Sequence, residues 1–565
     1  MTQPSPVPAP TDGSASGRSV DVVVIGAGFS GMYLLHRLRG HGLRVQVFEM
    51  ADDVGGTWHW NRYPGARCDI RSMEYSYSFD PQLEQEWQWT EKYPTQPEIL
   101  RYAHHVADRF DLRRDIRFRT RVESTVWDDA AERWTVRTDG GEEWTAQFVV
   151  HASGCLSIYK KPEIPGLESF RGAWYHTARW PHEGVDFTGL RVGVIGTGSS
   201  AIQSIPLIAR QAGDLTVFQR TPNFAVPAHN HPFPPGYQEE MKAHYPEFRE
   251  DARTSMLGIP HPPAEKGALE DDAESRRARY EKAWNDRDNT LVDLMAAYTD
   301  MLTDQAANDT AAEFVRERIR EIVHDPGVAE TLCPKDYPIG SKRICVATDY
   351  YETYNQPHVH LVDLRRTPLV EVTPAGVRTT EREYELDALV LATGFDAQTG
   401  ALTSIDIRGR GGQRLTDHWS AGPRSYLGIG IAGFPNTFVV TGPQSPSVLS
   451  NMMVSIEQHV EWISDCIAFV RERGIRTIEP TPEAEQAWVD HNAEVGNATL
   501  FPTANSWYMG SNVEGKPRVF MPYIGGVGPY RERCQEVAAN GYEGFLIDGA
   551  PSGAAASGRV PAGMS

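Results

Sequence analysis

Two glycine-rich turns carry the residue types that bind dinucleotides. The first, VVVIGAGFSG (22–31), follows an apolar run and leads into a segment with helical spacing. Gly26 permits the sharp bend, Gly28 lets a pyrophosphate approach the backbone, and Gly31 lets the helix pack on the strand. Glu49 ends the next apolar run, where a carboxylate accepts a hydrogen bond from a ribose hydroxyl. The alternative is a glycine turn without a ligand, but strand, helix and acid all have the expected spacing.

The second turn, VGVIGTGSSA (192–201), has the same design, with Ala201 as its third small residue. The apolar run that follows it ends in Arg220-Thr221 instead of an acid. An acid there would repel the additional phosphate of NADPH, whereas a guanidinium binds it with two hydrogen bonds. Lys342 is a second candidate for this phosphate. We therefore predict NADPH as the second nucleotide; the alternative is that Arg220 is a solvated surface charge.

Two dinucleotide sites on one chain indicate hydride transfer between a nicotinamide and a flavin, which passes the electrons onward. The six cysteines include no C-x-x-C pair, which argues against a disulfide scaffold, a zinc knuckle or a dithiol redox centre. Without a cluster of metal ligands in the sequence, oxygen is the leading electron acceptor. We expect FAD and NADPH as cofactors, O2 as a reactant and no metal site.

The elements that position these turns are visible in the spacing of apolar residues. Residues 20–49 and 190–220 each run from an apolar strand through a turn into a helix and a second strand. This predicts an α/β fold with two dinucleotide-binding Rossmann-like domains. Residues 238–330 are rich in Glu, Lys, Arg and Ala with helical spacing, which predicts a helical insertion. Helices are predicted at 274–284 and 311–323, and strands at 360–363 and 386–392.

The domain boundaries follow from these elements. Both ends of the chain are rich in Pro, Gly, Ser and Ala and have few side chains to bury, so we expect disordered tails. The predicted order is 1–18 tail, 19–150 first part of the FAD domain, 151–230 linker and first part of the NADPH domain, 231–335 helical insertion, 336–390 second part of the NADPH domain, 391–547 second part of the FAD domain, and 548–565 tail.

Composition limits the class of protein. A chain of 565 residues is too long for one ordinary core. The 40% hydrophobic and 23% charged residues are typical of a globular protein, and the net charge of −20 argues against nucleic-acid binding. No apolar run approaches the roughly 20 residues that span a bilayer, and the N-terminus lacks the pattern of a secretory signal. We expect a cytoplasmic protein without nucleic-acid or membrane partners; the sequence predicts no oligomeric state.

A segment between the two turns resembles a family fingerprint. FRGAWYHTARWP (170–181) fits the pattern F-x-G-x-x-x-H-x-x-x-W-P. It is similar to the fingerprint of Baeyer–Villiger monooxygenases, and as in that family it precedes the NADPH turn. A second family signature is similar to GGTWHWNRYPGARCD (55–69), and further similarity covers DALVLATGF (387–395) and SWYMGSNVEGKPRVF (506–520). The resemblance extends over residues 20–547 and points to the phenylacetone and steroid monooxygenase branch.

The resemblance implies that the protein inserts one oxygen atom of O2 beside a ketone carbonyl and so forms an ester or lactone. In that reaction a flavin peroxide anion attacks the ketone, and the adduct also carries negative charge. A permanently protonated guanidinium is suited to stabilising both. The resemblance assigns this catalytic role to Arg343, with Asp69 near it and the flavin. Without the resemblance, Lys342-Arg343 would be interpreted as a basic pair on the surface.

His176 belongs to a supporting group at the linker. The resemblance implies that it couples NADPH binding to active-site geometry; the residues alone favour a packed, hydrogen-bonded histidine between domains. The other members of the supporting group are Phe170, Gly172 and Trp180.

The FAD-binding candidates are Gly26, Gly28, Phe29, Ser30, Gly31, Glu49, Thr57, Trp58, Asp69 and Tyr75. The NADP-binding candidates are Gly196, Thr197, Gly198, Ser199, Ser200, Arg220, Thr221, Lys342, Arg343 and Trp507. The loop expected to border the substrate contains Ser447, Val448, Leu449 and Ser450.

One residue departs from the family pattern, and two other functions stay open. Arg71 stands where close relatives tend to have an acid, which leaves the charge around Asp69 open.

A flavin monooxygenase that oxidises nitrogen or sulfur atoms would share both turns, although Arg343 with Asp69 favours the peroxide anion over the hydroperoxide. The alternative of another class is a non-catalytic dinucleotide-binding sensor.

Overall fold

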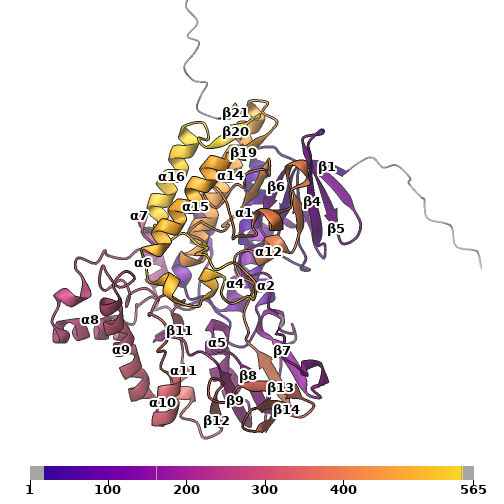
Figure 1. Cartoon of the computed structure of the whole chain (residues 1–565). Coiled ribbons are helices and arrows are strands. Elements are labelled where there is room, and N and C mark those ends of the chain that lie inside the picture. The colour runs from indigo at the N-terminus through magenta and orange to yellow at the C-terminus, as the bar shows by residue number, and fades with distance from the viewer. Residues whose placement is uncertain (1–17, 161, 549, 552–565) are drawn as a thin grey trace, which may run out of the picture.

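The computed structural model describes residues 18–160, 162–548 and 550–551 (Figure 1). Within them, the largest sheet has eight strands and contains the first glycine turn. Its order is β17-β4-β5-β6-β1-β2-β3, and β18 also pairs with β6. Strands β3, β2, β1, β6 and β18 are parallel, while β4 and β5 form antiparallel pairs. The strands are β1 (Arg18–Ile25), β2 (Val45–Phe48), β3 (Ile116–Arg117), β4 (Val122–Asp128), β5 (Arg133–Thr138), β6 (Glu143–His151), β17 (Asp406–Arg408) and β18 (Thr437–Val439).

Burial on both faces explains why β1 is a central strand. Its residues 22–25 are apolar without alternation, which is typical of a parallel strand covered on two sides. Val22 and Val24 pack on one side with helix α1 (Phe29–Gly40), which lies against α14 (Met452–Glu472). Val23 and Ile25 pack on the other side with residues of β5, β6 and the segment 402–439. The turn at the end of β1 is therefore held from both faces.

A second, parallel sheet contains the second glycine turn, in the order β12-β9-β8-β16-β7. Its strands are β7 (Ala173–His176), β8 (Arg191–Ile195), β9 (Asp214–Gln219), β12 (Val359–Asp363) and β16 (Ala388–Leu391). Helix α5 (Ser199–Ala209) connects β8 to β9, as α1 connects β1 to β2. The predicted α/β fold with two Rossmann-like units is confirmed, and in Figure 1 the two sheets lie at opposite ends of the molecule.

The segment 231–335 is mainly helical but does not form one body. Its helices are α6 (Tyr237–Ala243), α7 (Tyr245–Thr254), α8 (Ala273–Asn285), α9 (Gln305–Ile322) and α10 (Pro326–Leu332). Tyr245 of α7 belongs to the core beneath the first turn, whereas Tyr280 of α8 and Phe314 of α9 belong to the core of the second sheet. Helix α9 begins earlier than predicted because the Asp304 carboxylate caps it, accepting from the Ala307 amide at 2.9 Å.

The remaining elements are short or cover the first sheet. The other helices are α2 (Thr57–Trp60), α3 (Pro81–Glu86), α4 (Gln96–Arg109), α11 (Tyr350–Thr353), α12 (Gly400–Thr403), α13 (Leu415–His418), α15 (Pro482–Asn497) and α16 (Val527–Ala539). The small sheets pair β10 (Ala225–Pro227) with β11 (Cys345–Ala347), β13 (Leu369–Thr373) with β14 (Gly376–Thr379) and β15 (Glu383–Glu385), and β19 (Ile478–Pro480) with β20 (Phe545–Ile547) and β21 (Ala550–Pro551).

Two linkers cross between the sheets side by side. The first follows β6 and the second follows β16, and they form an antiparallel bridge at Tyr159 and Phe395. The Lys160 amide donates to the Gly394 carbonyl at 3.0 Å, and the Asp396 amide donates to the carbonyl of Ile158 at 2.8 Å. The two crossings therefore act as one hydrogen-bonded ribbon.

The predicted tails are wrong at their inner ends. Arg18 begins β1, and β21 pairs with β20. Asp548 accepts hydrogen bonds from the amides of Arg476 and Thr477 at 2.8 and 3.0 Å. Hydrogen bonds to neighbouring segments order these residues without a need for apolar side chains. The rest of both predicted tails, apart from these residues, lies outside the described residues.

Candidate active site

Arg343 and Asp69 form a bidentate ion pair across 274 residues of sequence. Arg343 Nε donates to Asp69 Oδ2 at 2.6 Å, and Nη2 donates to Oδ1 at 2.8 Å. Each side chain is 22% exposed. Burial opposes the charge of the guanidinium, but the Asp69 carboxylate outweighs burial and raises the pKa of Arg343. The pair thus keeps a fixed, charged arginine in a partly desolvated place.

The surroundings of this pair are mostly apolar. Arg343 Nη1 donates to the Val448 carbonyl at 2.8 Å. Tyr508 lies close to the guanidinium; burial raises the pKa of Tyr508 to about 12 although Arg343 acts in the opposite direction. Val448 and Tyr508 belong to a cluster of buried side chains that we call the apolar cluster: Cys155, Val448, Phe501, Tyr508, Met509, Phe520 and Ile524. Leu449 and Trp507 are partly buried against it. Such surroundings strengthen the interaction of a guanidinium with negative charge.

The loop expected to border a substrate is held by its own serines. Ser447 has a φ of +33°, which is unfavourable for a residue with a side chain. Its hydroxyl donates to the Thr441 carbonyl at 3.2 Å, and the Ser450 hydroxyl donates to the Ser447 carbonyl at 2.8 Å. These bonds stabilise the turn that directs the Val448 carbonyl at Arg343.

The first glycine turn has the form that a dinucleotide requires. Gly26 has a φ of +104°, and a Cβ there would lie 2.6 Å from the Ala152 carbonyl oxygen. Gly28 faces the backbone of Gly56, and a Cβ at Gly56 would lie 2.9 Å from Gly28 Cα, so the two backbones approach closely with no room for a side chain between them. Among the other predicted FAD residues, Phe29, Ser30 and Gly31 are buried in the first turn of α1, and Thr57 is exposed at the start of α2. Trp58 Nε1 donates to the Tyr75 hydroxyl at 3.0 Å.

Glu49 is buried at the end of β2 and already holds two backbone amides. Its carboxylate accepts from the amide of Ala27 at 2.7 Å and from the amide of Ala51 at 2.8 Å. Burial raises the pKa of Glu49, and these hydrogen bonds oppose that effect. The acid therefore ties the glycine turn to the loop after β2, and a ribose contact through its remaining lone pairs stays a prediction.

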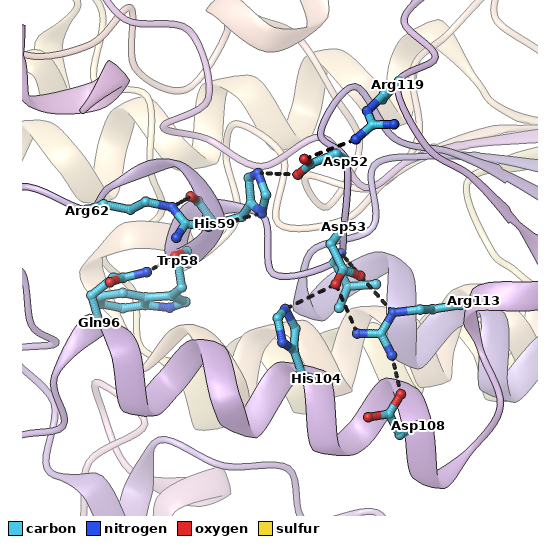
Figure 2. A network of polar contacts seen from close by, with 11 residues as sticks. Asp52, Asp53, Trp58, His59, Arg62, Gln96, His104, Asp108, Arg113 and Arg119 are labelled. Atoms are coloured by element: carbon cyan, nitrogen blue, oxygen red, sulfur yellow. Dashed lines mark hydrogen bonds and ion pairs between the residues drawn. The ribbon is translucent and has the colours of Figure 1, made fainter. Parts of the chain in front are cut away.

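Two acids that sequence reasoning missed anchor this loop (Figure 2). Asp52 Oδ1 lies 3.3 Å from Nε2 of His59. Asp53 Oδ1 accepts from Arg113 Nε at 2.7 Å, and Asp53 Oδ2 lies 3.4 Å from His104 Nε2 on α4. Burial acts to raise the pKa of Asp53, but Arg113 outweighs it and the pKa is lowered. The network holds α2 and the Gly56 backbone against the first turn.

The second glycine turn is open on its outer side. Gly196 has a φ of +110°, and a Cβ there would lie 2.5 Å from the Ala392 carbonyl oxygen. A Cβ at Gly198 would meet nothing within 4 Å. The Thr197 hydroxyl donates to the Thr221 carbonyl at 2.9 Å, which joins the turn to the segment after β9. These features fit a phosphate group at the start of α5.

Arg220 and Lys342 form a cationic pair that makes no ion pair with a carboxylate in the described residues, although the Asp336 carboxylate acts to raise the pKa of Lys342. The Lys342 ammonium lies 4.3 Å from the centre of the Tyr337 ring. Burial lowers the pKa of Lys342 to about 8, and the charges of Arg220 and Arg365 act in the same direction. Within the described residues, no carboxylate forms an ion pair with Arg220 or Lys342. The pair fits the dianionic phosphate that distinguishes NADPH.

Helix α5, which follows the second glycine turn, also contacts the segment that precedes Asp69. Gln203 on α5 accepts from the Tyr63 hydroxyl at 2.8 Å and donates to the Arg67 carbonyl at 3.1 Å. The Ser199 hydroxyl lies 3.3 Å from the Cys345 sulfur, two residues after Arg343. None of these three contacts is visible in local sequence patterns, because each joins residues more than 100 positions apart.

His176 is a neutral hydrogen-bonding residue at the linker ribbon. Its Nδ1 accepts from the Ala178 amide at 3.1 Å, so the proton on Nε2 is donated to the Thr393 hydroxyl at 3.1 Å. Thr393 donates onward to the Lys160 carbonyl at 3.2 Å. Burial lowers the pKa of His176 to about 4, and Arg179 acts in the same direction. These properties do not suit an acid or base at neutral pH.

The other supporting residues pack beside the ribbon. Phe170 and Trp180 are buried, and Trp180 contacts the ring of Phe187 with centroids 6.1 Å apart. A Cβ at Gly172 would lie 2.3 Å from the Asp387 carbonyl oxygen, so only glycine fits there.

Arg71 does not compete for Asp69. Arg71 Nε donates to Glu74 Oε1 at 2.6 Å, and Nη1 donates to the Asp288 carbonyl at 3.4 Å. Burial opposes its charge, but Glu74 raises the pKa of Arg71. The positive charge of Arg71, which departs from the family pattern, is thus paired with Glu74. Asp69 therefore remains paired with Arg343.

Several features of the described residues limit other chemistry. All six cysteines are buried and unpaired. No group of three or more His, Cys, Asp or Glu side chains in residues 18–160, 162–548 and 550–551 could hold a metal ion. Over the same ranges, no helix has the length and apolar character that crossing a bilayer requires.

Comparisons with known proteins place the chain among flavin enzymes. A model of the flavin-binding monooxygenase-like family matches residues 19–241. The chain is 42% identical over 533 residues to the acetone monooxygenase (methyl acetate-forming) of Gordonia sp. (strain TY-5), covering 94% of this chain and 99% of that protein. It is also 42% identical over 534 residues to a phenazine N-monooxygenase of Lysobacter antibioticus, covering 94% and 98%. A solved structure of oxidized steroid monooxygenase bound to NADP has 56% identity and a TM-score of 0.90, covering 94% and 99%.

Proposed function

Because the chain belongs to the Baeyer–Villiger monooxygenases, we propose that its Arg343–Asp69 pair is the catalytic centre of ketone oxygenation. The protein is an FAD- and NADPH-dependent enzyme that inserts one atom of O2 beside a ketone carbonyl to give an ester or lactone. The observation that carries the proposed site is the bidentate pair itself, which lies beside the apolar cluster.

FAD, reduced by NADPH, supplies the activated oxygen when it is bound. The chain's own task is to stabilise the negative charge that develops as a ketone is attacked. Asp69 and Val448 engage three of the five guanidinium N–H groups of Arg343. The other two are available to Tyr508 and to an anionic oxygen of the reaction. Because Asp69 orients the fork beforehand, little reorganisation is needed when charge appears.

The two cofactors are assigned by the two turns. We propose that residues 19–150 and 391–547 bind FAD, and that residues 151–230 and 336–390 bind NADPH. The glycine turns in separate sheets and the cationic pair of Arg220 and Lys342 support this assignment. A cytoplasmic location is part of the proposal, and the six unpaired cysteines support it because oxidising compartments favour disulfides.

The substrate is a ketone whose carbon skeleton suits apolar surroundings. The apolar cluster and the Ser447–Leu449 turn that contribute Val448 support this choice. N-oxygenation is the second candidate reaction, because a relative of equal identity is a phenazine N-monooxygenase. Arg343 with its own carboxylate favours the anionic oxygenating species and therefore the ketone.

A substrate panel tests this function directly. The FAD-loaded enzyme is given NADPH, oxygen and aryl, cyclic, terpenoid and steroid ketones, with a phenazine and a thioether as competing classes. Product mass and NADPH consumption are measured together. We expect esters or lactones formed in step with NADPH use. Formation of N-oxide or S-oxide, with no ester from any ketone, would overturn the proposed substrate class.

A further inference from the structure

Arg179 lies between two aromatic rings that come from different parts of the fold. Its guanidinium carbon is 4.3 Å from the centre of the Trp60 ring and 5.2 Å from the centre of the Tyr159 ring. Trp60 ends α2, beside the first glycine turn, and Tyr159 lies in the first linker. Arg179 itself follows β7 of the second sheet. One cation therefore contacts both nucleotide-binding units and the connection between them.

The rings of Trp60 and Tyr159 are the interaction partners of the Arg179 guanidinium. Within residues 18–160 and 162–548, no carboxylate forms an ion pair or a hydrogen bond with Arg179. The side chain is half-buried, and burial lowers the pKa of Arg179, while the Tyr159 hydroxyl acts in the opposite direction. A guanidinium is weakly hydrated and stacks well on aromatic faces, so it remains charged there.

Each ring lies in a segment that other contacts also hold in place. Tyr159 bridges to Phe395 of the second linker and packs on the His176 ring at 4.9 Å. Trp60 follows His59, which the Asp52 carboxylate anchors in the network of Figure 2. A second contact runs parallel to the first, because the rings of His59 and His182 lie 5.3 Å apart. The end of α2 thus faces the end of the fingerprint segment at two neighbouring points.

We propose that Arg179 is a positioning residue that holds the two nucleotide-binding units in the orientation required to bind NADP. This inference rests on the proposed function for its cofactors but not on the identity of the substrate. A cation–π contact contributes less than a buried bidentate ion pair, so the joint formed by Trp60, Tyr159 and Arg179 can open and close again. When binding requires one orientation, the apparent dissociation constant rises in inverse proportion to the share of molecules that keep that orientation.

The test measures NADP⁺ binding to the oxidised, FAD-loaded enzyme without any ketone, by flavin absorbance changes and by the shift in thermal unfolding temperature. Arg179→Gln removes the charge and keeps an unbranched, polar side chain. We expect the dissociation constant for NADP⁺ to rise by at least about two- to thirtyfold, the effect of one cation–π contact, because Arg179→Gln removes the contacts with both Trp60 and Tyr159. Arg179→Lys retains the cation and should recover part of the binding.

Two comparisons separate positioning from general damage. Arg171→Gln is the matched control, because Arg171 is an exposed arginine of the same segment and its side chain has no aromatic contact within the described residues. It should bind NADP⁺ as the unchanged protein does. Trp60→Leu should weaken binding by no more than Arg179→Gln does, because it removes one of the two ring contacts of Arg179. The double variant should bind no more weakly than Arg179→Gln alone, since Arg179→Gln already removes the contact with Trp60.

The outcomes are distinct from those of the substrate panel. Equal NADP⁺ binding by Arg179→Gln and Arg171→Gln would overturn the inference, as would additive effects of Arg179→Gln and Trp60→Leu. If Arg179→Gln loses FAD, the comparison moves to Trp60→Leu, and NADP⁺ binding by Trp60→Leu that equals that of Arg171→Gln would also overturn the inference. An enzyme that forms only N-oxides leaves these binding measurements intact, so the two proposals fail separately.

Discussion

Two arginines in this molecule are placed in opposite electrostatic settings. Arg343 has a carboxylate bound to it at 2.6 and 2.8 Å, while Arg220 lies near Lys342 and has no carboxylate ion-pair partner within the described residues. The first arrangement is complete before any ligand arrives, and the second is electrostatically unfavourable until an anion binds. A preorganised charge suits a reaction step, whereas an unsatisfied pair of charges suits recognition of a phosphate.

The largest effect is expected at the paired arginine. Arg343→Ala should leave a yellow protein that NADPH still reduces, since hydride transfer precedes the charge that Arg343 stabilises. Loss of one preorganised donor costs about 10²- to 10³-fold in rate, so ester formation should collapse. Stopped-flow absorbance with parallel product analysis separates the two steps.

Lysine at this position sharpens the comparison. Arg343→Lys keeps the charge but lacks the planar fork that Asp69 binds at two points, so it should recover little of the rate. Ester production near the original rate by either variant would remove Arg343 from the catalytic role.

The unpaired arginine should affect only one cofactor. Arg220→Ala should raise the KM for NADPH by about 10- to 100-fold, as expected for hydrogen bonds to a charged group, and leave the KM for NADH nearly unchanged. Steady-state kinetics with both nucleotides measures the difference. Equal losses with NADPH and NADH would mean that Arg220 does not contact the additional phosphate.

Lys342 predicts a pH dependence that Arg343 does not share. Burial lowers its pKa to about 8 in the free enzyme, with Arg220 acting in the same direction. A bound phosphate favours the charged lysine, so the KM for NADPH should be constant well below pH 8 and rise above it, by at most about tenfold per pH unit. The KM for NADH should not follow this curve. Lys342→Met should abolish the pH dependence, and a curve that persists in this variant would contradict the assignment.

The difference between these regions also shows how far sequence reasoning reaches. The glycine turns are local patterns, so the two Rossmann-like units and helix α8 were predicted nearly to the residue. The contact of Arg343 with Asp69 joins residues 274 positions apart, and only the family resemblance brought them together. The pairing of Arg71 with Glu74, the anchoring role of Asp52 and Asp53, and the rings around Arg179 depend on tertiary packing that no local spacing encodes.

The smallest effect is expected at His176. This residue lies on the linker ribbon that connects the two nucleotide-binding units. His176→Ala removes the hydrogen bonds to the Ala178 amide and to Thr393 and leaves both glycine turns intact. Two neutral hydrogen bonds contribute little each, so the yield of ester per NADPH consumed should fall about two- to tenfold while FAD stays bound.

The protonation state of His176 makes this prediction sharper. Burial lowers its pKa to about 4, well below the ordinary value of 6.5, so the ring is neutral in the folded protein above that range. Its folded pKa is depressed, so its contribution to folding is fully present above pH 6.5 and is lost as the pH falls towards 4. The coupling ratio of ester to NADPH should therefore show no step from His176 between pH 6 and 8. A step in that range that disappears in His176→Ala would show that the ring titrates during turnover, and would move His176 from the linker ribbon into the proton chemistry of the reaction.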